Sequence, residues 1–475
     1  MLFNSLEFMI FFPVVCLVYY VIPHRVRYIF LLACSYFFYM CWNPTYALLM
    51  LTSTAITYVS GLLLSSAEKI SDEGVRSRRK KWYVALSFAS NLSILFFFKY
   101  FNFAVDTVAR LLQAVHIQAQ TPTFDVILPV GISFYTFQAL SYTVDVYRND
   151  IYAEKNFLKY ALFVSFFPQL VAGPIERSKN LLLQINEKHR FEFERVREGL
   201  LLMLYGYFQK VVLAEYLGTA VDAVYNTYTE RTGFQLLLAT ILFAFQIYCD
   251  FGSYSNIAIG AAKVMGFRLM ENFNTPYLSR SVAEFWRRWH ISLSTWFKEY
   301  VYIPLGGNRK GVKRQVLNLL IVWGLTGIWH GASWNFVLWG LYYGVLLIFE
   351  KFVFKKVLDK LPSAIQHIYT MFIVVIGWGL FYFTDMSKLG TFLGDLFNFG
   401  NGICGEQALN LILSYLPLII AAAVASTPLA AKLYAKVQNT KYIGFAQTAF
   451  VAIVLILCTA SLVNQSYNPF LYFRF

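Results

Sequence analysis

Apolar segments of membrane-spanning length recur along the whole chain and leave no stretch long enough for a separate soluble domain. A transmembrane helix needs about 20 predominantly apolar residues. Charged residues make up only 14% of this chain, whereas soluble domains carry roughly a quarter. We therefore expect an all-α polytopic membrane protein that forms one membrane-embedded domain over residues 1–475. The expected spans lie at 7–23, 28–43, 46–64, 84–103, 123–144, 157–174, 198–216, 234–250, 315–350, 366–384, 406–427 and 446–464.

Basic residues gather in the short loops between these segments, which accounts for the formal net charge of +14 without a nucleic-acid partner. Cytoplasmic loops of membrane proteins are rich in lysine and arginine. The loops at 69–81 and 351–360 are therefore expected in the cytoplasm, and counting spans from them places both chain ends outside. No small-residue cleavage site follows the first apolar run, so we expect an anchor rather than a removed signal peptide.

Two of the apolar runs are unusual in length or composition. The run 315–350 has basic residues at both ends but is too short for two full spans, which need about 40 residues. Two arms of some 15 residues reach only roughly 22 Å, so we expect a re-entrant hairpin with its apex at 329–331 inside the membrane. The run 123–144 contains Pro129 and Gly131 and is expected to be broken.

Two histidines, His290 and His330, lie among tryptophans in the most apolar part of the chain. Ionisable groups at membrane depth are costly and often functional, and imidazole is suited to moving a proton near neutral pH. We interpret His330 as a base that accepts a proton from a hydroxyl group in a pocket walled by tryptophans. The alternative is a packing histidine bonded across helices. His290 is either an accessory histidine on the substrate side or part of an interfacial belt.

Arginines near these histidines suggest a basic mouth for an anionic donor. Arginine pairs well with phosphate or carboxylate, although arginines that snorkel to the interface would show the same pattern. Asp250, at the end of an apolar run, is expected to orient a histidine or an arginine, or to form a structural ion pair, with Arg287 as one possible partner. The candidate substrate-binding residues are Arg287, Arg288, Trp289, Trp329, Asp250 and Arg309.

Metal chemistry and disulfide bonding are not indicated. Neither His-Glu-x-x-His nor Cys-x-x-Cys occurs in the sequence, so we expect no metal ligands and no bound cofactor. Five of the six cysteines lie in or beside apolar runs, which does not suggest a disulfide framework.

The chain ends in an aromatic segment, 465–475, that is expected outside the membrane. An aromatic anchor at the interface is one interpretation. The other starts from Tyr472, which supplies one hydroxyl among apolar rings on a mobile end. Such a tail is able to enter a tunnel and present that hydroxyl to an active site.

Several motifs together resemble the membrane-bound O-acyltransferase family, in its bacterial alginate O-acetylation branch. The resemblance covers nearly the whole chain, and the combination of motifs is highly specific. One departure is the heptapeptide at 250–256, where the family more often has Asp-Phe-Ser-Gly-Tyr-Ser-Asp and this chain has Asp-Phe-Gly-Ser-Tyr-Ser-Asn, so Ser253 and Asn256 receive no role. The segments that carry the resemblance are 129–137, 172–174, 272–274, 276–277, 284–296, 304–309 and 329–331.

The resemblance implies a ring of about 11 transmembrane helices, with re-entrant or broken helices, around a tunnel that crosses the membrane. It also implies that His330 is the catalytic histidine and that His290 is the second one. The tail resembles a motif of cell-surface acylation systems in which a tyrosine carries the acyl group as a transient ester, which would give Tyr472 that role.

These expectations combine into one function. An acyl thioester in the cytoplasm, acetyl-coenzyme A, would donate to Tyr472 with His330 as general base, in the inner (plasma) membrane of a bacterium. An extracytoplasmic partner, such as an SGNH-type acyltransferase, would pass the acyl group to a polysaccharide or peptidoglycan. The alternatives are a D-alanyl or lipid acyltransferase that uses an acyl-carrier protein, and a non-enzymatic acyl transporter.

Overall fold

The computed structural model describes residues 1–117, 124, 128–398, 406–437, 440–441, 443–464 and 470–471. Every regular element in this part of the chain is a helix, which confirms the predicted all-α class. Within the same residues, eight helices are long and apolar enough to cross a membrane. The expected number of about 11 spans stays a prediction.

The chain divides into two compact units, and each is described by itself. Unit 1 comprises Met1–Leu200 and Ala258–Met270, and unit 2 comprises Leu201–Ile257 and Glu271–Phe475. The helices α9 (Phe193–Tyr207) and α11 (Gly233–Met265) contribute residues to both units. The expectation of a single domain over the whole chain stays a prediction.

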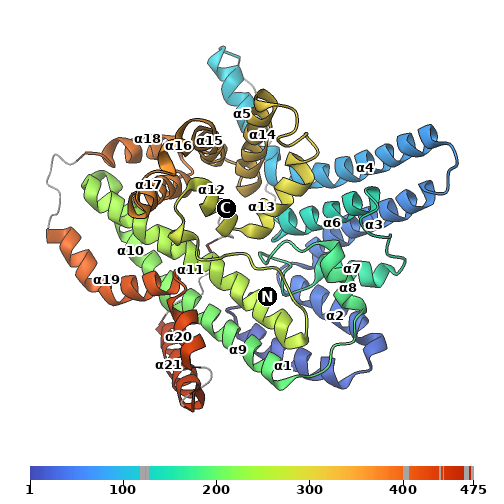
Figure 1. The fold of residues 1–475 in the computed structure, drawn as a ribbon, viewed down its shortest axis with the longest axis horizontal. Helices are drawn as coiled ribbons and strands as arrows, with labels where there is room; N and C mark the ends of the chain where they lie inside the picture. Colours follow the sequence, from blue (N-terminus) through green and yellow to red (C-terminus); the bar gives the residue numbers. More distant parts are fainter. Residues whose placement is uncertain are drawn as a thin grey trace. The chain divides into compact units, whose positions relative to one another are not determined.

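Unit 1 is a helical bundle in which α3 packs against both α4 and α6, and α2 packs against α7 (Figure 1). Buried hydroxyl and amide groups link neighbouring helices there. Ser53 donates to Asn91 at 2.5 Å, and Tyr160 donates to Thr57 at 2.7 Å. The helices of this unit are α1 (Leu6–Val21), α2 (His24–Met40), α3 (Pro44–Ala67), α4 (Glu73–Leu95), α5 (Phe101–Ala114), α6 (Ile132–Tyr147), α7 (Phe157–Ser165) and α8 (Ser178–Asn186).

Two predicted spans of unit 1 are shorter as helices than their apolar runs. In the run 123–144, α6 begins only at Ile132, because Gly131 is left-handed with φ 77° and Pro129 precedes it. The prediction of a broken segment is confirmed there. The prediction of a span at 157–174 is wrong, since α7 ends at Ser165 and the remainder forms turns. Apolarity alone did not reveal that the helix ends before Pro168. A proline disfavours helical geometry at the residue that precedes it.

Unit 2 contains the helices from the second part of α9 onward. Among them, α14 packs along α15, α15 packs against α17, and α10 packs against α19. The helices are α10 (Glu215–Tyr225), α12 (Val282–Arg288), α13 (Ile291–Phe297), α14 (Val312–His330), α15 (Trp334–Phe349), α16 (Lys355–Leu358), α17 (Ser363–Tyr382), α18 (Met386–Asp395), α19 (Glu406–Ala425), α20 (Leu429–Val437) and α21 (Ile443–Asn464). A π-helical segment, Phe208–Ala214, joins α9 to α10.

The predicted hairpin at 315–350 exists, and its turn lies directly after His330. Its arms are longer than expected, because α14 has 19 residues and the second helix runs from Trp334 to Leu358 for 25 residues. Helices of these lengths extend about 28 and 37 Å. The second arm is therefore long enough to cross a core of about 30 Å, whereas α14 is still slightly short of it and is not among the eight candidate spans of the described residues. The basic flanks continue the helices, since lysine and arginine are good helix formers. The depth of the apex stays a prediction.

Two glycines let α14 and α15 approach each other closely. A Cβ atom on Gly327 would lie 2.2 Å from the carbonyl oxygen of Phe336, and one on Gly340 would lie 2.3 Å from the carbonyl oxygen of Trp323. Small residues at a crossing are the usual means by which membrane helices bring their backbones together. The crossing therefore fixes the end of α14, where His330 lies.

Candidate functional site

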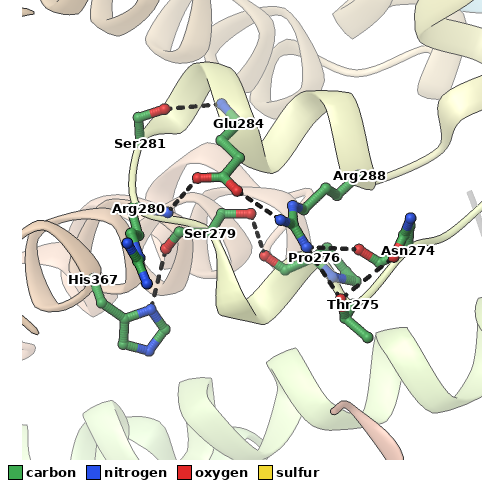
Figure 2. Close-up of polar contacts among 9 residues, drawn as sticks. All are labelled: Asn274, Thr275, Pro276, Ser279, Arg280, Ser281, Glu284, Arg288 and His367. Carbon is green, nitrogen blue, oxygen red and sulfur yellow. Dashed lines mark hydrogen bonds and ion pairs between the residues drawn. The ribbon is translucent and has the colours of Figure 1, made fainter. Parts of the chain in front are cut away.

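His290 lies at the corner between the short helices α12 and α13. Figure 2 shows the capping contacts at the start of α12. The Ser281 hydroxyl accepts from the backbone N–H of Glu284 at 3.0 Å, and the Glu284 carboxylate accepts from the backbone N–H of Arg280 at 2.9 Å. Paired caps of this kind satisfy backbone donors that a helix start leaves open. The entry of the chain into this corner is therefore well defined.

The end of α12 is held by Arg288, which also appears in Figure 2. Its guanidinium pairs with Glu284 at 2.8 Å and donates to the Thr275 hydroxyl at 3.2 Å. The backbone carbonyl of Arg288 accepts from the N–H of Asn274 at 2.9 Å. Arg288, a candidate for donor binding, therefore ties α12 to the segment before it, and its guanidinium is already engaged.

Asn272 holds His290 in one orientation. Its Oδ1 lies 3.0 Å from Nδ1 of His290 and also accepts from the Ser292 hydroxyl at 2.9 Å, while its Nδ2 donates to Ser255 at 3.1 Å. An amide oxygen only accepts, so Nδ1 of His290 carries the hydrogen and Nε2 of the neutral ring is the acceptor. His290 itself is buried and left-handed, with φ 45°, a conformation that turns the chain sharply from α12 into α13.

His330 is the last residue of α14 and is surrounded by aromatic rings. The ring centroids of Trp339 and Phe381 lie 4.9 and 5.4 Å from that of His330, both close to edge-on. Only 6% of His330 is exposed. Gly331 follows in extended conformation, and a Cβ atom there would meet the Phe336 ring at 2.2 Å. His330 is thus a buried imidazole at the carbonyl end of a helix, surrounded by aromatic rings.

The two histidines share a neighbour, Trp329. Its ring centroid lies 5.1 Å from that of His330 and 5.8 Å from that of His290. The structure therefore brings the two predicted histidines to one aromatic cluster in unit 2, although 40 residues separate them in the sequence. Trp329 adjoins both imidazoles, and its predicted role as a pocket wall stays a prediction.

The remaining tryptophan and arginine candidates differ in burial. Trp289 is buried in an aromatic cluster, with its ring 4.7 Å from Trp378 and 4.9 Å from Phe273. Arg287 and Arg309 are exposed. Of the three predicted arginines, these two present their side chains to a ligand more readily than Arg288.

Asp250 is buried and forms a structural ion pair, as one of the two interpretations expected, but its partner is Lys210 rather than Arg287. The distance between Lys210 Nζ and Asp250 Oδ1 is 2.7 Å. The other carboxylate oxygen of Asp250 accepts from the backbone N–H of Leu471 at 2.8 Å. Tyr472, the predicted acyl carrier, lies outside the described residues, but its neighbour Leu471 is buried in this unit.

Sequence reasoning missed two residues of this region, Asn272 and Lys210. Asn272 was noted only within a family motif, and Lys210 was not singled out at all. The detectable signal for Lys210 was a lysine inside a span, because a charge at that depth needs a partner.

The site and fold define a membrane protein with two buried histidines in an aromatic cluster. The chain belongs to the membrane-bound O-acyltransferase family, whose model matches residues 18–387. It is therefore an O-acyltransferase, an enzyme that transfers an acyl group to a hydroxyl group.

Several named proteins are similar to this chain. A probable alginate O-acetylase of Pseudomonas putida is 35% identical, and the alignment covers 100% of both chains. A peptidoglycan O-acetyltransferase of Helicobacter pylori is 32% identical over 80% of this chain and 77% of its own length. A teichoic acid D-alanyltransferase of Bacillus subtilis is 28% identical over 52% of this chain and 66% of its own length.

Proposed function

We propose that this enzyme takes an acetyl group from acetyl-coenzyme A on the cytoplasmic side and delivers it for O-acetylation of a cell-surface polysaccharide or peptidoglycan. Two relatives that align with 80% or more of this chain have names that specify O-acetylation of alginate or peptidoglycan. We further propose the bacterial plasma membrane as its location, with both termini outside.

The observation that carries this proposal is the position of His330. The carbonyl end of a helix favours positive charge, which is what an imidazole acquires when it takes a proton. The surrounding rings keep bulk water from competing with the acceptor hydroxyl for the thioester. A thioester is already activated, so one positioned base supplies the main assistance that the reaction needs.

The reaction follows from these groups. Nε2 or Nδ1 of His330 accepts the proton of the attacking hydroxyl. At the same time the hydroxyl oxygen forms a bond to the thioester carbonyl carbon. The carbon–sulfur bond then breaks, and the leaving thiolate takes the proton back from the imidazolium. The products are an ester and free coenzyme A. His290, whose Nε2 is set as an acceptor by Asn272 and whose ring lies 5.8 Å from that of Trp329, assists as the second histidine.

We propose Tyr472 as the first acceptor hydroxyl. The support is that its chain neighbour Leu471 and the preceding Phe470 are buried in the same unit as both histidines. An acyl-tyrosine would then give its acetyl group to an extracytoplasmic partner transferase of the SGNH type. Arg287 and Arg309 are the candidates to bind the phosphates of coenzyme A, because both are exposed and arginine pairs well with phosphate.

A carrier-protein donor with a D-alanyl cargo is the second candidate function. One observation supports it, the similarity to the teichoic acid D-alanyltransferase of Bacillus subtilis over 52% of this chain. Copurification of a stable complex with an acyl-carrier protein would favour this alternative over a coenzyme A donor.

The test is mass spectrometry of the purified enzyme after incubation with isotopically labelled acetyl-coenzyme A. We expect a labelled ester on Tyr472, its loss in Tyr472→Phe, and its loss in His330→Ala at unchanged protein level. A labelled His330→Ala protein would contradict the role of His330 as base. Label on another residue, or no label on a folded protein, would contradict the coenzyme A to tyrosine route.

A further inference from the structure

A buried charged cluster in unit 2 lies outside the two-histidine site. Lys210 lies between two acidic groups, Asp250 at 2.7 Å and Glu215 at 3.6 Å, and the side chains of all three are at most 5% exposed. Removing charged groups from water has a large desolvation cost that can exceed their mutual attraction, so a buried ion pair contributes little to stability by itself. The cluster calls for another explanation.

The second carboxylate oxygen of Asp250 supplies that explanation. Oδ1 faces Lys210, whereas Oδ2 accepts from the backbone N–H of Leu471 at 2.8 Å. Leu471 is 221 residues away in the sequence. A carboxylate that receives a backbone N–H makes one of the stronger hydrogen bonds in proteins, and burial protects it from competing water.

The residue before Leu471 is held by the same cluster. The Phe470 ring lies under Lys210, whose Nζ is 4.7 Å from the ring centroid, and its edge packs on Tyr254 at 5.0 Å. Phe470 is only 1% exposed. A desolvated cation over an aromatic ring is attracted by the negative face of that ring. Lys210 therefore serves both the carboxylate and the ring.

We propose that Lys210 and Asp250 form a receptor for the carboxy-terminal tail of this same chain. Asp250 binds the backbone at Leu471, and Lys210 with Tyr254 recognises an aromatic side chain at position 470. Because Asp250 contacts a backbone N–H, it fixes the register of the tail rather than the identity of residue 471. We call Lys210, Asp250 and Tyr254 together the tail seat, or the seat. Because the seat holds Leu471 at a fixed point, it would determine how far the next residue, Tyr472, reaches from that point.

The consequence for catalysis rests on the proposed function, whereas the seat itself does not. If Tyr472 accepts the acyl group, a fixed Leu471 limits the positions that its hydroxyl can take, and limiting them lowers the entropic cost of reaching the thioester. The experiment must therefore measure tail position and acyl transfer separately.

Hydroxyl-radical footprinting of the full chain in detergent measures tail position, because oxidation of Phe470 reports its exposure to water. Leu471→Pro removes the N–H that donates to Asp250 and leaves the cluster intact. Leu471→Val is the matched control, because valine is close to proline in size and keeps the N–H. A second variant, the triple substitution Lys210→Met, Asp250→Leu and Glu215→Gln, removes the seat without leaving a buried charge unpaired.

We expect oxidation of Phe470 to rise about tenfold in Leu471→Pro and in the triple variant, and to stay near the wild-type value in Leu471→Val. Protection of Phe470 in both disrupted variants would overturn the seat, whatever happens to activity. Exposure of Phe470 together with a wild-type rate of transfer from labelled acetyl-coenzyme A would leave the seat standing and contradict the tyrosine relay. Exposure with loss of transfer would support both.

Discussion

The two buried histidines of unit 2 share Trp329 as a neighbour but are held by different forces. His290 is held by a direct hydrogen bond to Asn272, and Asn272 is held in turn by a hydrogen bond to Ser255. His330 is placed by the packing of two helices, since the close approach at Gly327 fixes the end of α14 on which it lies. A hydrogen bond sets which ring nitrogen carries the proton, whereas packing sets where the ring is and what surrounds it. Placement by packing suits a base that must gain and lose a proton, because it positions the ring without fixing which nitrogen carries the hydrogen.

The first prediction separates the two histidines by the size of their effects. General bases contribute about 10²- to 10⁴-fold to rates, so His330→Ala should lower acyl transfer by that range. His290→Ala should lower it less, because its Nδ1 is already committed to Asn272. The measurement is the initial rate of transfer from labelled acetyl-coenzyme A, at matched protein levels in the membrane. Equal losses in the two variants would contradict the assignment of His330 as the main base and His290 as the accessory histidine.

The second prediction tests whether packing holds His330. In Gly327→Ala the new methyl group would lie 2.2 Å from the Phe336 carbonyl oxygen, so α14 and α15 must separate. Overpacking of this kind costs typically about 1–3 kcal/mol, and we expect a lower melting temperature and a large loss of transfer.

Gly324→Ala is the matched control, because nothing lies within 4 Å of a Cβ atom at that position of the same helix. Alanine also has a better helix propensity than glycine. We expect wild-type activity and an equal or higher melting temperature. If both glycine variants behave alike, the crossing does not position His330.

The third prediction removes the polar support of His290. Asn272→Ala deletes the acceptor of the Nδ1 hydrogen and should lower transfer by about tenfold, the equivalent of one hydrogen bond. Asn272→Asp keeps an oxygen at the same place and should recover part of the rate. The comparison with His290→Ala is decisive, since Asn272→Ala combined with His290→Ala should be no slower than His290→Ala alone. Additive losses would show that Asn272 acts elsewhere.

The fourth prediction concerns the arginines and carries the smallest effect. Arg287 is exposed, so Arg287→Gln should raise KM for acetyl-coenzyme A a few-fold and leave the melting temperature unchanged. Arg288 is bonded to Glu284 and Thr275, so Arg288→Gln should lower the melting temperature and change KM less. Titration of activity against coenzyme A donor concentration and a thermal melt distinguish them. The opposite pattern would move the donor contact to Arg288.

The helical class and the α14–α15 hairpin could be predicted from apolarity and from the basic loops, because the bilayer imposes its length on every span. The lengths of the hairpin arms could not, since helices continue into basic flanks that a hydropathy reading excludes. The run at 157–174 failed for a related reason, because its composition suits a membrane helix while the turns after Ser165 take it out of helical geometry.

By itself, the sequence determined that the chain is a helical membrane O-acyltransferase and that His290 and His330 are its conspicuous ionisable groups. Residue types and motif spacing are local properties that can be read directly from the sequence. Only the tertiary structure decided that Trp329 adjoins both histidines, that Asn272 orients one of them, and that Asp250 pairs with Lys210 and the tail instead of an arginine. These contacts join residues far apart in the chain. Which of several polar groups becomes the partner of a buried charge depends on how the helices pack, and no local pattern records that choice.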